Sequence, residues 1–177
     1  MLSFKHFGVV LFFLVLLVAA CSYGYEWTTA QATTYDGKRS FTLSFPPFLK
    51  PETQRKLHDE APIQYANYFR NVYAIAYDTL APDYRSVAQT EITNLLAIAQ
   101  KPQLIDTATL TIDGKPAYMG IYTGNVGRGD IEERIYYQLV FVQGTDRVYV
   151  LVQWVWDKNR EKYRETLKQV ATSFKEG

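Results

Sequence analysis

Cys21 is the only cysteine of this 177-residue chain, so its sulfur is the first group to consider for chemistry. A lone cysteine can serve as a nucleophile, as a metal ligand or as one half of an intermolecular disulfide. The first two roles need a basic or ligating neighbour, and apart from His6 the chain has only His58 to offer. Cys21 also follows directly on an apolar run that ends in small residues, and this position indicates a different use.

Residues 1–20 have the composition of a secretory signal peptide. Such a signal combines a positive start, an apolar stretch and small residues at the cleavage site. Lys5 supplies the positive charge, residues 7–18 are almost all apolar, and Ala19 and Ala20 are small enough to enter a peptidase pocket. We therefore predict a signal peptide over residues 1–20.

The last residues of this segment and the cysteine resemble the lipobox of bacterial lipoproteins, here Val18-Ala19-Ala20-Cys21. The resemblance implies that a signal peptidase recognises Val18, Ala19 and Ala20 and cleaves after Ala20. It also implies a diacylglycerol on the Cys21 sulfur and a further acyl chain, such as palmitate, on the new amino terminus. Two alternatives stay open: an uncleaved membrane anchor, and an ordinary secretory signal followed by an incidental cysteine.

An acylated Cys21 would fix the place where the protein works. Two or more acyl chains hold a protein stably at a bilayer, so no membrane-spanning segment would be needed. We therefore expect a lipid-anchored protein of the bacterial cell envelope. Ser22 stands where an aspartate would indicate retention in the inner membrane of many Gram-negative bacteria, so the outer membrane is favoured in such a cell.

The charge balance excludes some classes of partner. Residues 1–20 hold one of the 19 basic residues and none of the 18 acidic ones, so the remaining 157 residues (177 minus 20) carry 18 of each. A chain without net charge lacks the basic face that nucleic-acid binding requires, and it lacks the basic patch of a protein held to membranes by charge. With no second cysteine, the fold has to be stable without disulfides.

The sequence contains no recognisable catalytic constellation. His58 has no partner at ligand spacing, so we expect a surface or locally hydrogen-bonded histidine rather than a metal site. Glu132 and Glu133 point to opposite faces of a predicted strand, whereas paired-carboxylate catalysis needs both groups on one substrate. Neither a Gly-x-Ser-x-Gly elbow nor a phosphate-binding Gly-Lys-Ser/Thr loop is present. We therefore expect no enzyme, no metal and no cofactor.

Two further segments contain single residues of interest. The glycine-rich residues 124–130 are predicted to be a plain loop between strands, and their Arg128-Gly129-Asp130 matches an integrin-binding tripeptide that is expected by chance. Asn71 lies in an otherwise apolar predicted strand, where a buried amide must be hydrogen-bonded. A structural hydrogen bond is the favoured interpretation of Asn71, and a ligand contact is the alternative.

Residue periodicity and turn signals divide the rest of the chain into elements. Helices are predicted from Pro82-Asp83 to Pro102 and after Asp157. The last helix should bury Tyr163, Leu167 and Val170 on one face, with Phe174 as a docked terminal residue. Residues 21–38 are predicted to be a flexible tether with a short strand at its end, and Asp36-Gly37 predicts a turn. Because residues 147–156 are apolar on both faces, they should form a central strand that is covered on both sides. The predicted strands are 40–45, 68–77, 107–112, 116–123, 131–142 and 147–156. This order predicts one α+β domain over residues 39–177, with a mostly antiparallel sheet of about six strands flanked by helices.

The two ends of this domain resemble PsbP-like domains of the PsbP/DcrB type. The opening strand and proline, Phe41-Thr42-Leu43-Ser44-Phe45-Pro46, match the start of such domains. The last strand, the last helix and Ser173-Phe174-Lys175 match their end. The resemblance extends over roughly residues 38–176 and implies a binding or assembly role with no shared catalytic residue.

Together these features predict a membrane-anchored envelope lipoprotein with a non-catalytic role in binding or assembly toward a protein partner. The alternative is a carrier of a small ligand, with a pocket between the sheet and residues 50–62. A hydrolase of unusual type is the least favoured class. The sequence identifies neither the partner nor the ligand-binding residues.

Overall fold

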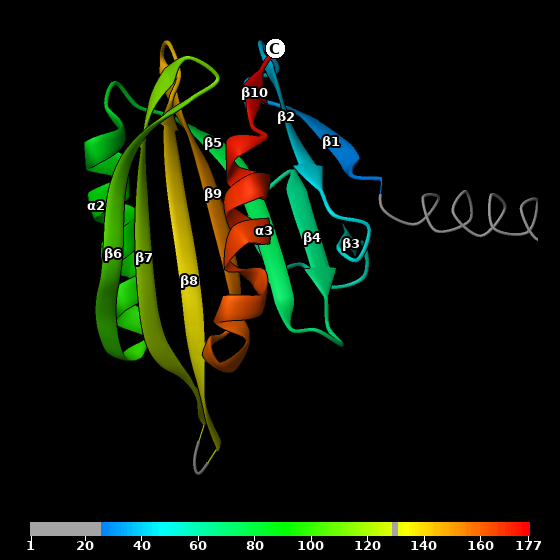
Figure 1. Cartoon of the computed structure of the whole chain (residues 1–177). Helices are drawn as coiled ribbons and strands as arrows, with labels where there is room; N and C mark the ends of the chain where they lie inside the picture. Colours follow the sequence, from blue (N-terminus) through cyan, green and yellow to red (C-terminus); the bar gives the residue numbers. More distant parts are fainter. Residues whose placement is uncertain (1–25, 129–130) are drawn as a thin grey trace, which may run out of the picture.

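The computed structural model describes residues 26–128 and 131–177, which form two antiparallel sheets and two α-helices (Figure 1). The predicted signal peptide and Cys21 lie outside these residues. No helix of the described part is long and apolar enough to cross a membrane. The strands are β1 (Thr28–Thr33), β2 (Ser40–Phe45), β3 (Lys50–Pro51), β4 (Ile63–Asn67), β5 (Val72–Leu80), β6 (Gln100–Ile112), β7 (Lys115–Arg128), β8 (Ile131–Gln143), β9 (Arg147–Trp156) and β10 (Lys175–Glu176). The helices are α2 (Tyr84–Ile98) and α3 (Arg160–Thr172), with the short 3₁₀ turn η1 (Asp157–Asn159) before α3.

A seven-stranded sheet forms the centre of the domain, in the order β3-β4-β5-β9-β8-β7-β6. The second sheet has three strands in the order β1-β2-β10. Strand β9 lies between β5 and β8, and most of its side chains are buried on both faces. The prediction of an α+β domain with a central strand over residues 147–156 is therefore confirmed.

One face of the large sheet carries a row of aromatic side chains. The strand register aligns Tyr73, Trp154, Tyr137 and Tyr122 across β5, β9, β8 and β7. Helix α2 contacts β6, β7 and β8, and Tyr137 and Tyr122 are buried. Tyr73 and Trp154 are only half-buried and stack on each other, with ring centroids 5.2 Å apart. Tyrosine suits this position because its ring packs while its hydroxyl remains near water.

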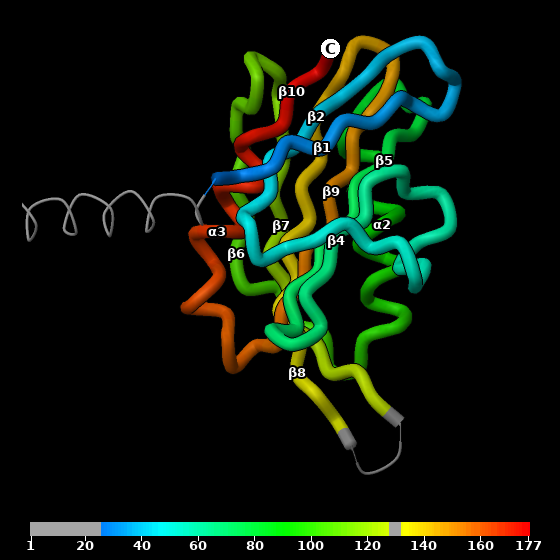
Figure 2. The backbone as a smooth tube through the Cα atoms, turned by 90° about the vertical axis from the view of Figure 1, so that its right-hand side faces the viewer, coloured from blue at the N-terminus to red at the C-terminus, as the bar shows by residue number. Residues whose placement is uncertain are grey.

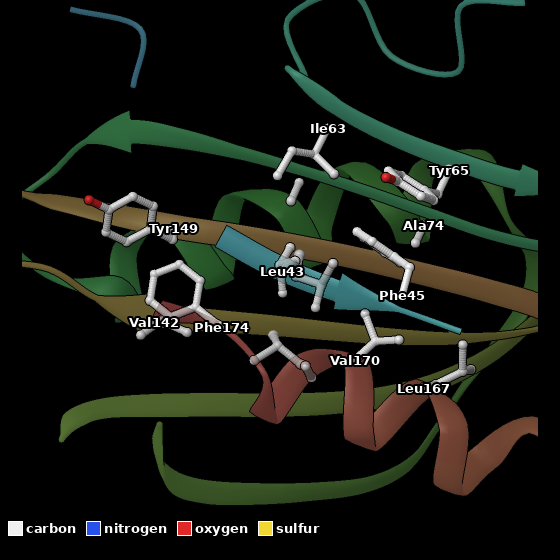
Figure 3. Close-up of a cluster of buried hydrophobic side chains, with 14 of the residues drawn as sticks. Leu43, Phe45, Ile63, Tyr65, Ala74, Val142, Tyr149, Leu167, Val170 and Phe174 are labelled. Carbon is white, nitrogen blue, oxygen red and sulfur yellow. The ribbon is translucent and has the colours of Figure 1, made fainter. Parts of the chain in front are cut away.

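The opposite face is covered by β2 and α3 (Figure 3). Alternate residues of β2 point inward, and Phe45 stacks on Tyr65 of β4 with ring centroids 3.9 Å apart. The predicted buried stripe of the last helix is confirmed, because Tyr163, Leu167 and Val170 are all in the core. Beyond the helix, Phe174 packs against Phe41 and Tyr149, as expected for a docked terminal residue.

The strand predicted over residues 68–77 is wrong at its start. Strand β4 ends at Asn67, and residues 68–71 form the turn into β5. The Asn67 side chain holds this turn: its Oδ1 accepts the Arg70 N–H at 2.8 Å, and its Nδ2 donates to the Phe48 carbonyl at 2.7 Å. Asn71 has a positive φ of 52°, a conformation that asparagine tolerates well. The aromatic residues of this turn resemble a strand in the sequence, but the hydrogen bonds of the Asn67 side chain stabilise a turn instead.

Other element boundaries also differ from the predictions. Residues 28–33 form β1, so the folded part begins before residue 39. Strand β7 runs to Arg128, so most of the predicted loop 124–130 is strand. Helix α2 ends at Ile98, and Pro102 lies in β6 instead of ending the helix. A proline is tolerated there because β6 is an edge strand, which pairs only with β7 in the described part of the chain.

Gly124 lets the end of α2 approach the sheet closely. A Cβ added to Gly124 would lie 2.7 Å from the Cβ of Ala99, the residue that ends the helix. Real Cβ atoms do not approach other atoms so closely, so either α2 or β7 would have to move. The glycine that suggested a loop in the sequence therefore serves close packing between a helix and a strand.

Gly124→Ala is expected to destabilise the protein by about 1–3 kcal/mol, because the added methyl group overpacks the contact with Ala99. The double variant Gly124→Ala/Ala99→Gly should recover part of this loss, since the second change removes the clashing methyl group. Chemical denaturation of the two single variants and the double variant measures the coupling. Strictly additive losses would contradict the proposed contact.

Candidate functional site

A surface cleft of about 510 Å³ opens where β1 and β5 both end. In Figure 2 two of the segments that line it, the β1–β2 turn and the end of β5, lie toward the upper right. Four segments that are distant in the sequence build it: the end of β1 with the β1–β2 turn, the chain just before β4, the end of β5 and the start of β9. The lining residues are Thr33, Tyr35, Asp36, Glu60, Pro62, Asp78, Thr79, Leu80 and Arg147.

The β1–β2 turn places Asp36 at the floor of this cleft. Gly37 has a positive φ of 72° and its N–H donates to the Thr34 carbonyl at 2.8 Å, which confirms the turn predicted from Asp36-Gly37. The Thr34 hydroxyl donates to Asp36 Oδ1 at 2.8 Å and fixes the orientation of the carboxylate. Turn chemistry thus positions an acidic side chain that no sequence motif marks as functional.

Arg147, the first residue of β9, is completely buried beneath the cleft. Its Nη1 donates to Asp78 Oδ2 and its Nη2 to Asp36 Oδ2, both at 2.7 Å. Its Nε donates to Asp146 Oδ1 at 3.3 Å. A buried guanidinium is stable only when it is paired and hydrogen-bonded, so Arg147 ties the β1–β2 turn to β5 and β9.

The hydrogen bond between Asp36 and Arg147 favours the charged form of both groups. The Arg147 guanidinium donates to Asp36 and holds the pKa of that carboxyl well below its usual range, despite an opposing effect of burial. The same bond to Asp36, with the bond to Asp146, raises the pKa of Arg147 above its usual value. At neutral pH the floor therefore holds an ionised Asp36 in a fixed position, between the buried Arg147 guanidinium and the exposed Lys38 ammonium, which lies 3.7 Å from Asp36 Oδ2.

Two apolar side chains stand at the rim of the acidic floor. Tyr35 is 89% exposed and Leu80 is 64% exposed. The Tyr35 N–H donates to Asp78 Oδ1 at 3.0 Å, so the rim and the floor are held together. Exposed apolar residues beside fixed polar groups are typical of surfaces that bind another molecule. The arrangement can accept a cationic group against the carboxylates and an apolar group against the rim.

A second polar network beside the cleft fixes the C-terminal strand. Glu176 accepts a hydrogen bond from the Tyr149 hydroxyl at 2.7 Å and forms ion pairs with Lys115 and Arg39. Burial of the Glu176 carboxylate opposes its ionisation, but the hydrogen bonds from Lys115 and Tyr149 outweigh that effect and lower its pKa. These groups form hydrogen bonds and ion pairs with one another, which indicates a structural role.

The gap between the two layers of the core has no room for a small ligand. The space between β2, the large sheet and α3 measures about 10 Å³, less than one water molecule needs. Its walls include Phe41, Leu43, Tyr149 and Phe174, which are all buried. The large hollows of the described residues are therefore at the surface.

The structure places most of the sequence-selected residues away from the cleft floor. His58 stacks on Tyr77 at 4.8 Å and its Nδ1 accepts the Glu60 N–H at 3.2 Å, which confirms a locally hydrogen-bonded histidine. Asn71 accepts a hydrogen bond from the Tyr73 hydroxyl at 3.5 Å, but it lies in a turn and not in a strand. Val18, Ala19, Ala20 and Cys21 lie outside the described residues.

The carboxylates selected from the sequence do not form a paired site. Glu132 accepts a hydrogen bond from Asn125 at 2.7 Å and lies 3.8 Å from the Lys101 ammonium, whereas Glu133 is in register with Val126 on the other face of β8. Among residues 26–128 and 131–177, no group of three or more potential ligands could hold a metal ion.

Sequence reasoning missed the cleft because its parts are far apart along the chain. The floor combines Asp36, Asp78 and Arg147, and only the fold brings them together. One signal was available, since Arg147 is a charged residue at the start of a strand that is otherwise almost entirely apolar. A buried position for that strand implies a carboxylate partner, although it does not identify which one.

Arg147→Met is expected to cost about 3–5 kcal/mol of stability at pH 7, because it leaves the surrounding carboxylates without their buried counter-charge. The hydrogen bond lowers the native pKa of Asp36, so its contribution is complete above the unfolded pKa of about 4 and disappears as the pH falls through the native value. The difference between wild type and variant should therefore shrink below about pH 4. Urea unfolding at pH 7 and pH 3 measures it.

Arg39→Met provides the matched control, because Arg39 is partly exposed and its ion pairs are 3.4–3.7 Å long. A cost below about 1 kcal/mol is expected for this change. Equal losses for the two variants, or a loss for Arg147→Met that stays constant with pH, would contradict the assignment.

Comparison with known proteins indicates the fold. No protein-family model matches the chain, and no curated protein matches it at the sequence level. Among solved structures it resembles the cyanobacterial PsbP protein CyanoP from Synechocystis sp. PCC 6803, with a TM-score of 0.58 and 11% identity over 84% of this chain and 92% of that one. It also resembles the Ran-binding protein Mog1p of Saccharomyces cerevisiae, with a TM-score of 0.57 and 14% identity over 85% and 96%.

A third similar structure is LpqN of Mycobacterium tuberculosis, which is described as involved in cell envelope biogenesis. Its TM-score is 0.53, at 17% identity over 85% of this chain and 91% of LpqN. Identities this low establish the fold and not the function. The chain has a PsbP-like fold, as the residues at its two ends predicted.

Proposed function

We propose that the protein is a lipid-anchored component of the bacterial cell envelope with a non-catalytic role in binding or assembly toward a protein partner. Cys21 is the proposed lipid attachment point, after removal of residues 1–20. The outer membrane is the favoured location if the cell is Gram-negative, because Ser22 follows the cysteine. The partner meets the domain at the cleft above Arg147.

The cleft carries this proposal. Its exposed Tyr35 and Leu80 side chains stand beside carboxylates that Arg147 holds in place, on a fold whose interior is filled. A binding surface that is already ordered loses little entropy on association. Its chemistry fits a protein segment that presents a lysine or arginine next to an apolar side chain.

Similar structures give the proposal support by analogy. Mog1p is described as a Ran-binding protein, and LpqN is described as involved in cell envelope biogenesis. A binding role and an envelope location therefore both occur on this fold, in different proteins. The step from those proteins to this chain is an inference, because a shared fold does not fix a shared function.

A small cationic ligand is the second candidate. The cleft volume of about 510 Å³ falls in the range of ligand sites. Glu60 and Pro62 belong to the region 50–62 that the sequence singled out for a ligand pocket, and they line the cleft. A hydrolase has weaker support, because Asp36 is held ionised by Arg147 and so has no proton to donate as a general acid at neutral pH.

The lipid anchor predicts a clear effect of Cys21→Ser. Without the sulfur, no diacylglycerol can be attached, and lipoprotein processing requires that modification. Metabolic labelling with an acyl-chain probe should find no label in the variant, and the precursor should stay uncleaved. Normal processing of Cys21→Ser would rule out the anchor and leave an ordinary secretory signal.

The partner site predicts position-specific crosslinking in cells. A photoreactive residue in place of Tyr35 or Leu80 should yield the same adduct, because both side chains stand on the rim of one cleft. The control position is Lys168, which is exposed on α3 and lies outside the cleft lining. Adducts at all three positions, or at none, would contradict a partner site at the cleft.

A further inference from the structure

An aromatic face that also carries arginine lies where the chain enters the domain. Trp27 is the residue before β1, and it lines a surface groove of about 530 Å³ together with Phe48 and Arg70. The β4–β5 turn continues this face with Tyr68 and Phe69. In Figure 1 the start of β1, strand β3 and this turn all lie on the right-hand side of the domain. We call the surface the entry face; it comprises Trp27, Phe48, Arg55, Tyr68, Phe69 and Arg70.

Phe69 is exposed to an extent that the fold does not explain. It is 95% exposed at the tip of the turn, whereas most phenylalanines are largely buried. The turn itself is fixed by Asn67 through the Arg70 N–H and the Phe48 carbonyl, so the Phe69 side chain is not needed to shape it. Turns normally use small or polar residues, so an exposed phenylalanine here indicates contact with another phase or molecule.

The arginines of the entry face are placed against its aromatic rings. The Arg70 guanidinium carbon lies 4.7 Å from the Phe48 ring centroid, and that of Arg55 lies 4.9 Å from the Tyr68 ring centroid. Tyr68 also packs edge-on against Tyr73 at 5.5 Å, which joins the entry face to the aromatic row of the large sheet. Aromatic rings with adjacent cationic heads are the side chains preferred at the boundary between lipid and water.

The predicted anchor lies within reach of this face. Six residue steps separate Cys21 from Trp27, and an extended chain of that length spans at most roughly 20 Å. A lipid on Cys21 would therefore keep Trp27 close to the bilayer. The cleft is at the other end of β1, and that six-residue strand is about 20 Å long.

We propose that the entry face rests on the phospholipid headgroups of the membrane, with Trp27 and Phe69 entering the interfacial region. This inference rests on the proposed lipid anchor and adds an orientation to it. Glu26 precedes Trp27 and Glu52 lies three residues before Arg55, so two acidic residues accompany the two arginines and the aromatic side chains supply most of the interaction. The face is consistent with the absence of net charge, because it does not depend on a basic patch.

In this orientation one end of β5 lies at the bilayer and the other end lies away from it. Phe69 precedes β5 and Leu80 ends it, and a nine-residue strand is about 30 Å long. Contact at the entry face therefore leaves the cleft with Tyr35 and Leu80 directed away from the bilayer. A membrane-bound protein in this orientation presents its partner site to the surrounding compartment.

Site-specific quenching tests the orientation. The full acylated protein carries an environment-sensitive label at Phe69→Cys and is reconstituted into vesicles of phosphatidylethanolamine and phosphatidylglycerol that contain a headgroup-level quencher lipid. The control is Leu80→Cys, another exposed apolar position at the other end of β5. The label at residue 69 should be quenched several-fold more than the label at residue 80, with unchanged thermal stability in both variants.

The possible results separate this inference from the anchor itself. If the acylated protein floats with the vesicles but residues 69 and 80 are quenched equally, the anchor holds and the orientation is wrong. If the protein neither carries acyl chains nor floats, the proposed lipid anchor is wrong, and the orientation that rests on it is wrong as well. Shielding of residue 69 without vesicles, in proportion to protein concentration, would assign the face to a second copy of the chain and overturn the membrane contact.

Discussion

The central strand β9 has to be kept from water on both of its faces, and the rest of the domain is arranged around that requirement. A sheet that is apolar on both sides is stable only if separate elements cover each side. Helix α2 covers one face together with the chain before β4, and β2 with α3 covers the other. The cover on the second face comes from opposite ends of the described chain, so the N-terminal hairpin and the C-terminal helix are both needed to complete the core on that face.

The same requirement explains why a charged residue at the start of β9 has such a large structural role. Arg147 enters the buried layer with the strand, and its guanidinium can remain there only with hydrogen-bonded carboxylates around it. Those carboxylates come from the β1–β2 turn and from β5. The interaction that holds the N-terminal hairpin on the sheet therefore also forms the acidic floor of the cleft. The structural role and the proposed binding role share one group of side chains, so a substitution at Arg147 alone cannot separate them.

The entry face and the cleft lie at opposite ends of the domain. Strands β1 and β5 both begin near the entry face and both end at the cleft. The proposed attachment point before Trp27 and the proposed partner site near Leu80 therefore lie at opposite ends of the same two strands. Such an arrangement suits a tethered protein, because anchoring does not compete with binding. The filled interior fits the same use, since surfaces rather than cavities are available for contact.

The fold class, the central position of residues 147–156 and the buried stripe of α3 could be predicted from the order of apolar residues, because periodic burial requires a periodic sequence. The turn at Asp36-Gly37 followed from local chemistry. The prediction failed at residues 68–71, where the side chain of Asn67 overrides an aromatic pattern, and at residues 124–130, where Gly124 serves packing instead of a loop. Which carboxylates meet Arg147 depends on how the distant segments fold together. Asp78 and Asp36 are 69 and 111 residues away from Arg147 in the sequence. No local pattern around Arg147 can indicate which distant residues the fold brings into contact with it.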